Sequence, residues 1–214
     1  MPDVNFQIEA VEALTFAAAP LLNFKLRMST AAGEGPIHSG LLRCQIQLAA
    51  TRRRYNPQEQ ERLLDLFGEP DRWSQTLRNM LWTHVSATVP AFAEDAVVDL
   101  QVPCTFDFNV AATKYFYALE NGEIPLLFLF SGTIFYAAED GALQVGQIAW
   151  DKEATFRLPV ATWRAMMEHY YPNSAWLSVR KDVFDRLYAY KRQHGLPTWE
   201  QVLERLLAAE EVAQ

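Results

Sequence analysis

The sequence predicts an α+β fold: a mainly antiparallel β-sheet or sandwich, a helical insertion at about residues 56–82, and C-terminal helices. Three observations support this prediction. Apolar and polar residues alternate through the first third of the chain. Apolar residues recur every three or four positions in the insertion and after residue 159, and the densest apolar block lies at residues 105–138. A period of two is typical of strands, and a period near 3.6 is typical of amphipathic helices.

The strands of the first third each have one apolar face, as in an antiparallel sheet with one solvated side. The alternating apolar positions are Val4, Phe6 and Ile8; then Leu22, Phe24, Leu26 and Met28; and, after a break at residues 33–36, Leu42, Cys44, Ile46 and Leu48. Residues 83–89 and 96–102 are expected to form further strands.

The insertion begins with a strong helix-start signal. Asn56 can cap the helix, Pro57 fits its first position, and Glu59 can complete a capping box. Gly68 is expected to end this helix. A second helix is predicted from Asp71, with an apolar side formed by Trp73, Leu77, Met80 and Leu81.

The apolar block at 105–138 divides into several elements. Phe106, Phe108 and Val110 alternate as in a strand. Residues 112–119 have helical spacing, with Ala112, Tyr115, Phe116 and Leu119 on one side, although a hairpin turning at Asn121-Gly122 is the alternative. We favour the helix. Residues 126–136 then form a central strand, with Pro125 fitting only its first position.

The last third is predicted to contain one or two strands at 143–156 and then three helices. Trp163, Met166, Met167 and Tyr170 form one apolar stripe, and the later helices follow in the 183–207 region. No linker or repeat separates these parts. We therefore expect a single domain, β-rich over residues 1–158 and helical over 159–208.

Composition limits the function. The chain has 214 residues and a net charge of −7, and neither half is basic, which argues against a broad nucleic-acid surface. The N-terminus lacks the features of a signal peptide, and the longest apolar run, Ile124–Phe130, is far shorter than the ~20 residues that span a bilayer. A cytoplasmic location without a membrane span is expected.

Cofactor and metal signatures are weak. Cys44 and Cys104 stand apart without a CxxC pair, so two reduced, buried thiols are favoured over one disulfide. The histidines have no metal-binding spacing; they are His38, His84, His169 and His194. We expect no metal and no cofactor, although a fold can assemble metal ligands from distant segments.

Catalytic candidates are scattered. Ser131 lies in Phe-Ser-Gly-Thr, which lacks the GxSxG pattern of a nucleophile elbow. Asp151 and Glu153 would share one face of a strand, so acid–base chemistry is conceivable, but a solvated strand or turn is favoured. An enzyme hypothesis would draw on these three residues and His84.

Two short segments are candidates for interaction. Arg52-Arg53-Arg54 could grip an acidic partner or phosphate, or could pair with Glu59, Glu61 and Asp65, which we favour. The second segment is Trp150-Asp151-Lys152.

Several strings, in order, resemble a bacterial family catalogued as a domain of unknown function, number 6084. They are RRRYNPQEQERLLDLFGEP, LWTHVSATVPAF, VPCTFDFNVAATKYFYALENGEIPLLFLFSGTIF, WDKEATFRLPVATW and GLPTWEQVLERLL. The resemblance covers about residues 4–207. It implies no catalytic residues. Because members are often encoded beside actinobacterial-type nickel–iron hydrogenases, it implies an accessory or assembly role.

The combined expectation is a non-catalytic cytoplasmic accessory protein that binds a hydrogenase subunit or maturation factor. An enzyme with a site assembled from scattered residues is the first alternative. A peptide-binding chaperone, which requires an exposed apolar groove, is the second.

Overall fold

The computed structural model describes residues 2–31, 35–105, 110–138 and 140–211. The chain divides into two compact units, Met1–Ser174 and Ala175–Gln214, and each is described by itself. The single domain expected from the sequence stays a prediction.

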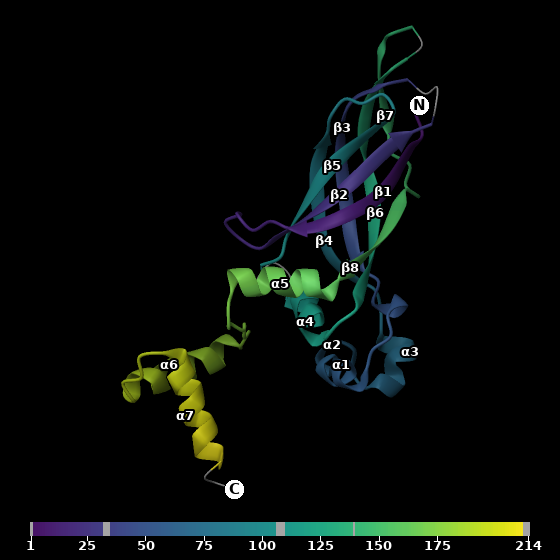
Figure 1. The fold of residues 1–214 in the computed structure, drawn as a ribbon. Helices are drawn as coiled ribbons and strands as arrows, with labels where there is room; N and C mark the ends of the chain where they lie inside the picture. Colours follow the sequence, from purple (N-terminus) through teal and green to yellow (C-terminus); the bar gives the residue numbers. More distant parts are fainter. Residues whose placement is uncertain (1, 32–34, 106–109, 139, 212–214) are drawn as a thin grey trace. The chain divides into compact units, whose positions relative to one another are not determined.

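The first unit contains two antiparallel sheets (Figure 1). The three-stranded sheet has the order β1 (Val4–Ala13), β2 (Leu21–Thr30), β5 (Asp95–Pro103). The five-stranded sheet has the order β4 (Met80–Val89), β3 (Ile37–Leu48), β6 (Glu123–Ala137), and then β7 (Leu143–Gln147) and β8 (Glu153–Pro159), which pair with different halves of β6. These sheets and the helices confirm the α+β prediction.

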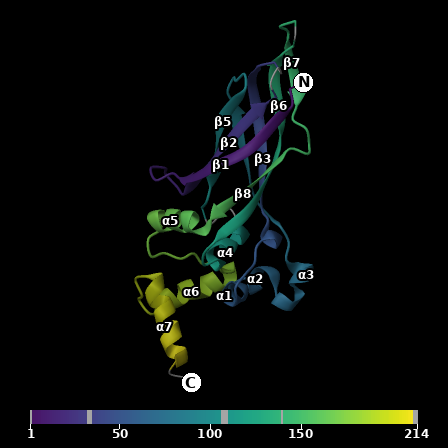
Figure 2. The same ribbon diagram turned by 45° about the vertical axis from the view of Figure 1, so that its right-hand side comes forward.

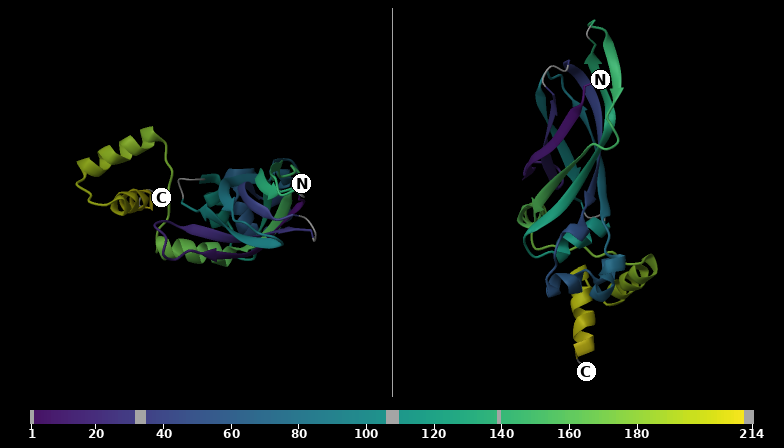
Figure 3. Two further views of the ribbon diagram at one scale, coloured as in Figure 1. Left: turned by 90° about the horizontal axis from the view of Figure 1, so that it is seen from above. Right: turned by 90° about the vertical axis from the view of Figure 1, so that its right-hand side faces the viewer.

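The two sheets pack face to face and enclose the core, as the two layers in Figure 3 show. The predicted alternation places the core correctly: Leu22, Phe24, Leu26 and Met28 of β2 and Leu42, Cys44, Ile46 and Leu48 of β3 are all buried. Phe24 contacts the rings of Trp82 and Phe128 from the other sheet. At the edges, β4 approaches β5 and β1 approaches β8. The strands therefore form a sandwich that is nearly closed along both sides.

Helices lie at one end of the sandwich (Figures 1 and 2). They are α4 (Val110–Ala118), α5 (Val160–Tyr170) and the insertion, which comprises η1 (Ala50–Arg52), α1 (Pro57–Arg62), α2 (Leu64–Phe67), η2 (Pro70–Arg72) and α3 (Trp73–Thr76). Phe116 of α4 contacts both Trp82 and Trp163, with ring centroids 5.0 Å apart in each pair. These contacts join the helices to the sandwich core. The helix predicted at 112–119 is confirmed over the alternative hairpin.

Three boundaries differ from the prediction. The second helix of the insertion ends at Thr76, and Met80 and Leu81 belong to β4, because Trp82 is drawn into the core between Phe24 and Phe116. Val110 begins α4 instead of ending a strand, and Phe106 and Phe108 lie outside the described residues.

The third difference concerns β6. This strand begins at Glu123, so Pro125 is its third residue and not its first. The Pro125 carbonyl oxygen accepts a hydrogen bond from the Ala49 N–H at 2.8 Å. An N–H on residue 125 would face Ala49, beyond the end of β3, and the Ala49 carbonyl oxygen already accepts from Arg52 N at 2.8 Å, so the missing N–H is tolerated inside the strand.

The second unit contains two helices, α6 (Lys181–Gln193) and α7 (Trp199–Glu211). The Trp199 ring lies 5.2 Å from Phe184 and 6.3 Å from Tyr188. Lys191 donates to the carbonyl oxygens of Leu196 and Pro197, both at 2.8 Å. The aromatic contacts and the lysine hold the turn between the two helices.

Candidate functional site

Arg53 and Glu59 form a buried ion pair, with Nη2 and Oε1 separated by 2.6 Å and only 8% and 3% of their side chains exposed. Arg53 also donates to the carbonyl oxygens of Asn121 (2.8 Å) and Glu123 (2.6 Å). The capping box predicted at Asn56 is present, because Glu59 N donates to Asn56 Oδ1 and Glu59 Oε2 accepts from Asn56 N. The pair therefore fastens the insertion to the turn that precedes β6.

Two tyrosines extend this network. The hydroxyls of Tyr55 and Tyr115 are 2.7 Å apart, and Tyr55 also donates to the Ala50 carbonyl oxygen. Burial raises the pKa of Tyr115 to about 12 and raises the pKa of Tyr55 further. Both phenols are therefore protonated near neutral pH and act as hydrogen-bond donors and acceptors within the network.

The arginine run is therefore divided in its roles. The pairing with Glu59 that the sequence favoured is confirmed for Arg53, whereas Arg52 and Arg54 are exposed. Arg53 contacts β6 at Glu123, and the Lys152 carbonyl oxygen accepts from the N–H of Phe130. Glu123 and Phe130, the two contact points on β6, are seven residues apart, which corresponds to about 23 Å along the strand. The arginines and the Trp150-Asp151-Lys152 segment do not form one surface patch.

The second predicted segment lies in the connection between β7 and β8. Trp150 is 94% exposed, and Asp151 is exposed as well. Lys152 forms an ion pair with Asp3, with Nζ and Oδ1 separated by 2.7 Å. Trp150 is thus available to a partner, whereas Lys152 already has one within the chain.

Of the residues of the enzyme hypothesis, His84, Ser131 and Glu153 lie on one face of the five-stranded sheet, whereas Asp151 lies in the turn before β8 and, contrary to the expectation, does not share a strand face with Glu153. Strand register places His84 of β4 and Glu153 of β8 in one row, with Gln45 and Leu129 between them. Three strand spacings correspond to about 14 Å. His84 Nε2 lies 3.3 Å from Gln45 Oε1. The register also brings Glu153 opposite Leu129, two residues from Ser131 on β6, but within the described ranges no hydrogen bond joins two members of this set.

The outward side of the five-stranded sheet is the strongest candidate surface. We define the outer face as the side chains that β3, β4 and β6 direct away from the core: Leu41, Arg43, Gln45 and Gln47; Leu81, His84, Ser86 and Thr88; and Leu127, Leu129, Ser131 and Thr133. Within this described set, Arg43 is the only charged side chain apart from the titratable His84. Leu41 is 60% exposed.

The outward side of the three-stranded sheet is different in kind. Lys25 pairs with Glu12 (3.0 Å) and Asp99 (2.8 Å), and Arg27 pairs with Glu9 and Asp95. A ladder of ion pairs of this kind is typical of a solvated sheet face. The outer face differs in having few charged side chains along β3, β4 and β6 and exposed leucines at positions 41 and 81.

A hollow of about 540 Å³ lies on the outer face, between Leu41, Arg43, Ser86, Thr88, Ser131 and Thr133. Of the four enzyme candidates only Ser131 lines it. Gly132 lies in its floor with φ of +144°, and a Cβ there would lie 2.1 Å from the Leu41 carbonyl oxygen. The hollow thus depends on a glycine that permits close approach of β3 and β6.

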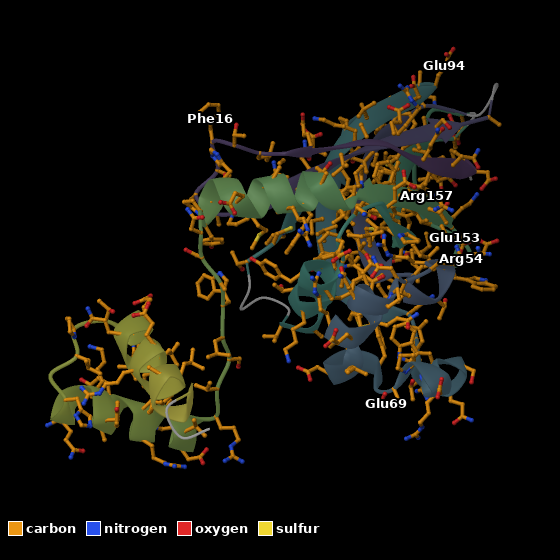
Figure 4. All side chains as sticks on the ribbon, turned by 60° about the horizontal axis from the view of Figure 1, so that its bottom comes forward. Phe16, Arg54, Glu69, Glu94, Glu153 and Arg157 are labelled. Atoms are coloured by element: carbon orange, nitrogen blue, oxygen red, sulfur yellow. The ribbon has the colours of Figure 1, made fainter. Side chains whose placement is uncertain are left out.

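Other features of the first unit are less informative. Phe16 is fully exposed at the tip of the β1–β2 loop (Figure 4), and the Tyr170 hydroxyl hydrogen-bonds the loop at Leu14 and Ala17. A hollow of about 520 Å³ near Tyr117 and Trp163 lies on the helical end. Single exposed aromatics are common on soluble proteins, so neither feature outweighs the outer face.

Metal and membrane features are absent from the described ranges. No group of three or more His, Cys, Asp or Glu side chains there could hold a metal ion. Cys44 and Cys104 are both free and buried, as the sequence favoured, and burial raises the pKa of each to about 12. None of the helices in these ranges has the length and apolar character that a membrane crossing needs.

Sequence reasoning did not identify the outer face. Leu41-Leu42 interrupts the alternation of β3, and this irregularity was the available signal for an exposed leucine. Whether Leu81 faced out depended on the bulge near Thr83, which shifts the β3–β4 register and which periodicity does not reveal.

The architecture is that of an α+β protein built on a β-sandwich. The chain belongs to the Family of unknown function (DUF6084), whose model matches residues 1–214, and the resemblance stated from the sequence is confirmed.

Two solved structures show weak similarity. A CARDB domain from Pyrococcus furiosus, in complex with di-metal ions, is 13% identical over 74% of this chain and 92% of that one, with a TM-score of 0.29. A β-glucosidase from Kluyveromyces marxianus is 8% identical over 73% of this chain and 15% of that one, with a TM-score of 0.26. Scores this low support no conclusion. No curated protein matches.

Proposed function

We propose that this protein is a non-catalytic accessory protein that binds another protein through the outer face of its five-stranded sheet. The observation behind the proposal is an uncovered sheet face that is apolar or uncharged at nearly every position, with Leu41 60% exposed. The centre of an interface is depleted of charged residues, as this face is along β3, β4 and β6. Arg43 supplies one cation that can fix the orientation of the partner.

The partner implied by the family resemblance is a hydrogenase subunit or a maturation factor, and the proposed compartment is the cytoplasm. The chain offers no CxxC pair and no histidine-rich tract that would suggest a metal donor. The proposed role is therefore to hold or deliver a protein and not a nickel ion.

The test is a pull-down from the native host with the tagged full-length chain and two variants. Leu41→Lys places a charge on the outer face, in the row that Leu41 shares with Thr88 and Thr133, and should reduce recovery of the partner at least tenfold. Val97→Lys, at a 46% exposed valine on the other sheet, is the matched control and should recover the partner as the wild type does. Recovery of no hydrogenase subunit or maturation protein, or equal recovery with Leu41→Lys, would contradict the proposal.

A peptide-binding chaperone would use the same face, because the hollow is uncharged apart from Arg43. The two functions differ in selectivity. A chaperone should bind unfolded polypeptides of unrelated sequence with similar affinity, whereas the proposed accessory protein should bind one folded partner.

A further inference from the structure

Strand β7 is an open edge of the five-stranded sheet. It pairs with β6 on one side, and the described residues place no strand on its other side. The hairpin formed by β6 and β7 extends past the ends of the neighbouring strands in two views (Figures 1 and 3). An edge of this kind presents unpaired backbone groups to solvent.

The register shows which backbone groups those are. Ile148 N donates to the Gly132 carbonyl oxygen, and Ala138 N donates to the Ala142 carbonyl oxygen. Hydrogen-bonded positions alternate along an antiparallel pair. Gln144 and Gly146 therefore direct their N–H and C=O groups toward β6. The residues that direct theirs away from the sheet are Leu143, Val145 and Gln147.

The edge is short, at five residues, but it lacks the side chains that usually protect an edge. Natural edge strands are guarded by lysine, proline or inward-pointing charge, and β7 reads Leu-Gln-Val-Gly-Gln. Leu143 and Val145 are 63% and 61% exposed. The strand thus combines three free N–H and C=O pairs with apolar side chains on two of the same residues.

We propose that two copies of this chain pair through β7, antiparallel, about a two-fold axis at Val145. This inference goes beyond the proposed function, because it uses the sheet edge and not the outer face. Centring at Val145 pairs Leu143 with Gln147 of the other copy and Val145 with its own equivalent. This register uses all three outward-facing residues of each strand and forms six hydrogen bonds, whereas centring at Gln144 or Gly146 leaves one outward residue of the strand without a strand partner.

Three properties favour a second copy as the occupant. The strand is uncharged, so placing it opposite itself brings no like charges together. A two-fold interface covers the β7 edge of both copies at once, so neither β7 edge remains free to add a third copy. Exposed Trp150 follows β7 by three residues, and in this register it lies at the level of the turn that precedes β7 in the other copy. Because five residues a side bury little surface, the dimer should be weak and concentration-dependent.

Sedimentation velocity of the full chain over a wide concentration range tests the pairing. The wild type should shift from monomer toward dimer as concentration rises. Val145→Pro removes an outward N–H that the β6–β7 ladder does not use, and Val145→Lys places like charges across the axis; each should weaken dimerisation at least tenfold. Val97→Lys is the matched control and should behave as the wild type does.

Chemical cross-linking tests the register. Val145→Cys should give a disulfide-linked dimer on mild oxidation, because residue 145 lies directly opposite its equivalent, whereas Gln144→Cys, offset diagonally by about 7–8 Å from its equivalent, should give far less. The native thiols should not interfere, since both are buried and the pKa of each is raised to about 12.

Two results would overturn the inference: a wild type that stays monomeric at every concentration, or variants of Val145 that dimerise as the wild type does. Neither result would touch the outer-face proposal, which the Leu41→Lys pull-down tests separately. Leu41→Lys itself should leave the self-association unchanged.

Discussion

Arg53 and Glu59 show how a basic run that suggests a binding site can serve the fold instead. Both side chains lie almost entirely out of solvent, and each satisfies several backbone groups of neighbouring segments. Gly122, with φ of +75°, belongs to the same arrangement, since a Cβ there would lie 3.4 Å from Arg53 Nη1. A buried charge that loses its partner is costly, because the remaining charge stays desolvated.

Glu59→Gln should therefore lower the free energy of unfolding by about 3–5 kcal/mol. The substitution keeps the shape of the side chain and leaves the Arg53 guanidinium without its counter-charge. Urea denaturation followed by fluorescence measures the effect. Glu61→Gln, at an exposed position on the same helix, is the control and should change stability by less than about 0.5 kcal/mol. Similar losses for both variants would show that the ion pair is not what fastens the insertion.

Strands β3 and β6 approach each other closely beside the hollow, and Gly132 makes that approach possible. Leu42 and Gly132 are register partners in the centre of the five-stranded sheet. A Cβ on residue 132 would overlap the Leu41 carbonyl oxygen, so any side chain there would push the two strands apart. Stability and the shape of the outer face thus depend on the same residue.

Gly132→Ala should lower the free energy of unfolding by about 3 kcal/mol, because backbone strain and a clash with backbone atoms both contribute. Gly141→Ala separates the two causes. Gly141 also has positive φ, +79°, but nothing lies within 4 Å of its Cβ position. Its substitution should cost only about 1 kcal/mol. Equal losses in thermal denaturation would mean that the clash plays no part.

Elements were predicted well where local pattern and tertiary environment agree. The strands with one apolar face, the capped helix at Asn56 and the helix predicted at 112–119 are of this kind. The prediction failed at Met80 and Leu81, whose helical spacing was overridden when Trp82 entered the core and a bulge near Thr83 set the register of β4.

The main hydrophobic core of the protein lies within the first unit. The members of this core that the structure describes lie between Val4 and Met167. In the second unit the buried side chain within the described range is Val202. Cooperative unfolding depends on one continuous core, so the first unit has what it needs to fold without the second.

A chain ending at Ser174 should accordingly fold. It should show one cooperative thermal transition and retain the near-ultraviolet circular dichroism of its buried aromatic residues, such as Phe116 and Trp163. Val202→Asp in the full-length chain provides the complementary control, since it places a charge at the buried apolar side chain of the second unit. A truncated chain with no cooperative transition would contradict this division of stability.

The candidate sites, like the elements, divide into those that the local sequence pattern predicts and those that depend on the tertiary structure. From the alternation of residues alone one can derive the fold class, the inward side of β2 and β3, the buried thiols and the pairing of Arg53 with Glu59. Those properties depend on contacts between near neighbours or on the period of a single strand. The outer face and the open edge of β7 were not derivable in this way.

The reason is that both surfaces are defined by what lies beside them. Leu41 and Val145 occupy outward positions in apolar strands, and periodicity cannot tell whether another layer covers such a position. That depends on which strands the two sheets contain, on the order β4-β3-β6-β7, and on the helices gathering at one end of the sandwich. Burial is a property of the assembled layers, and only these show that the face and the edge remain open.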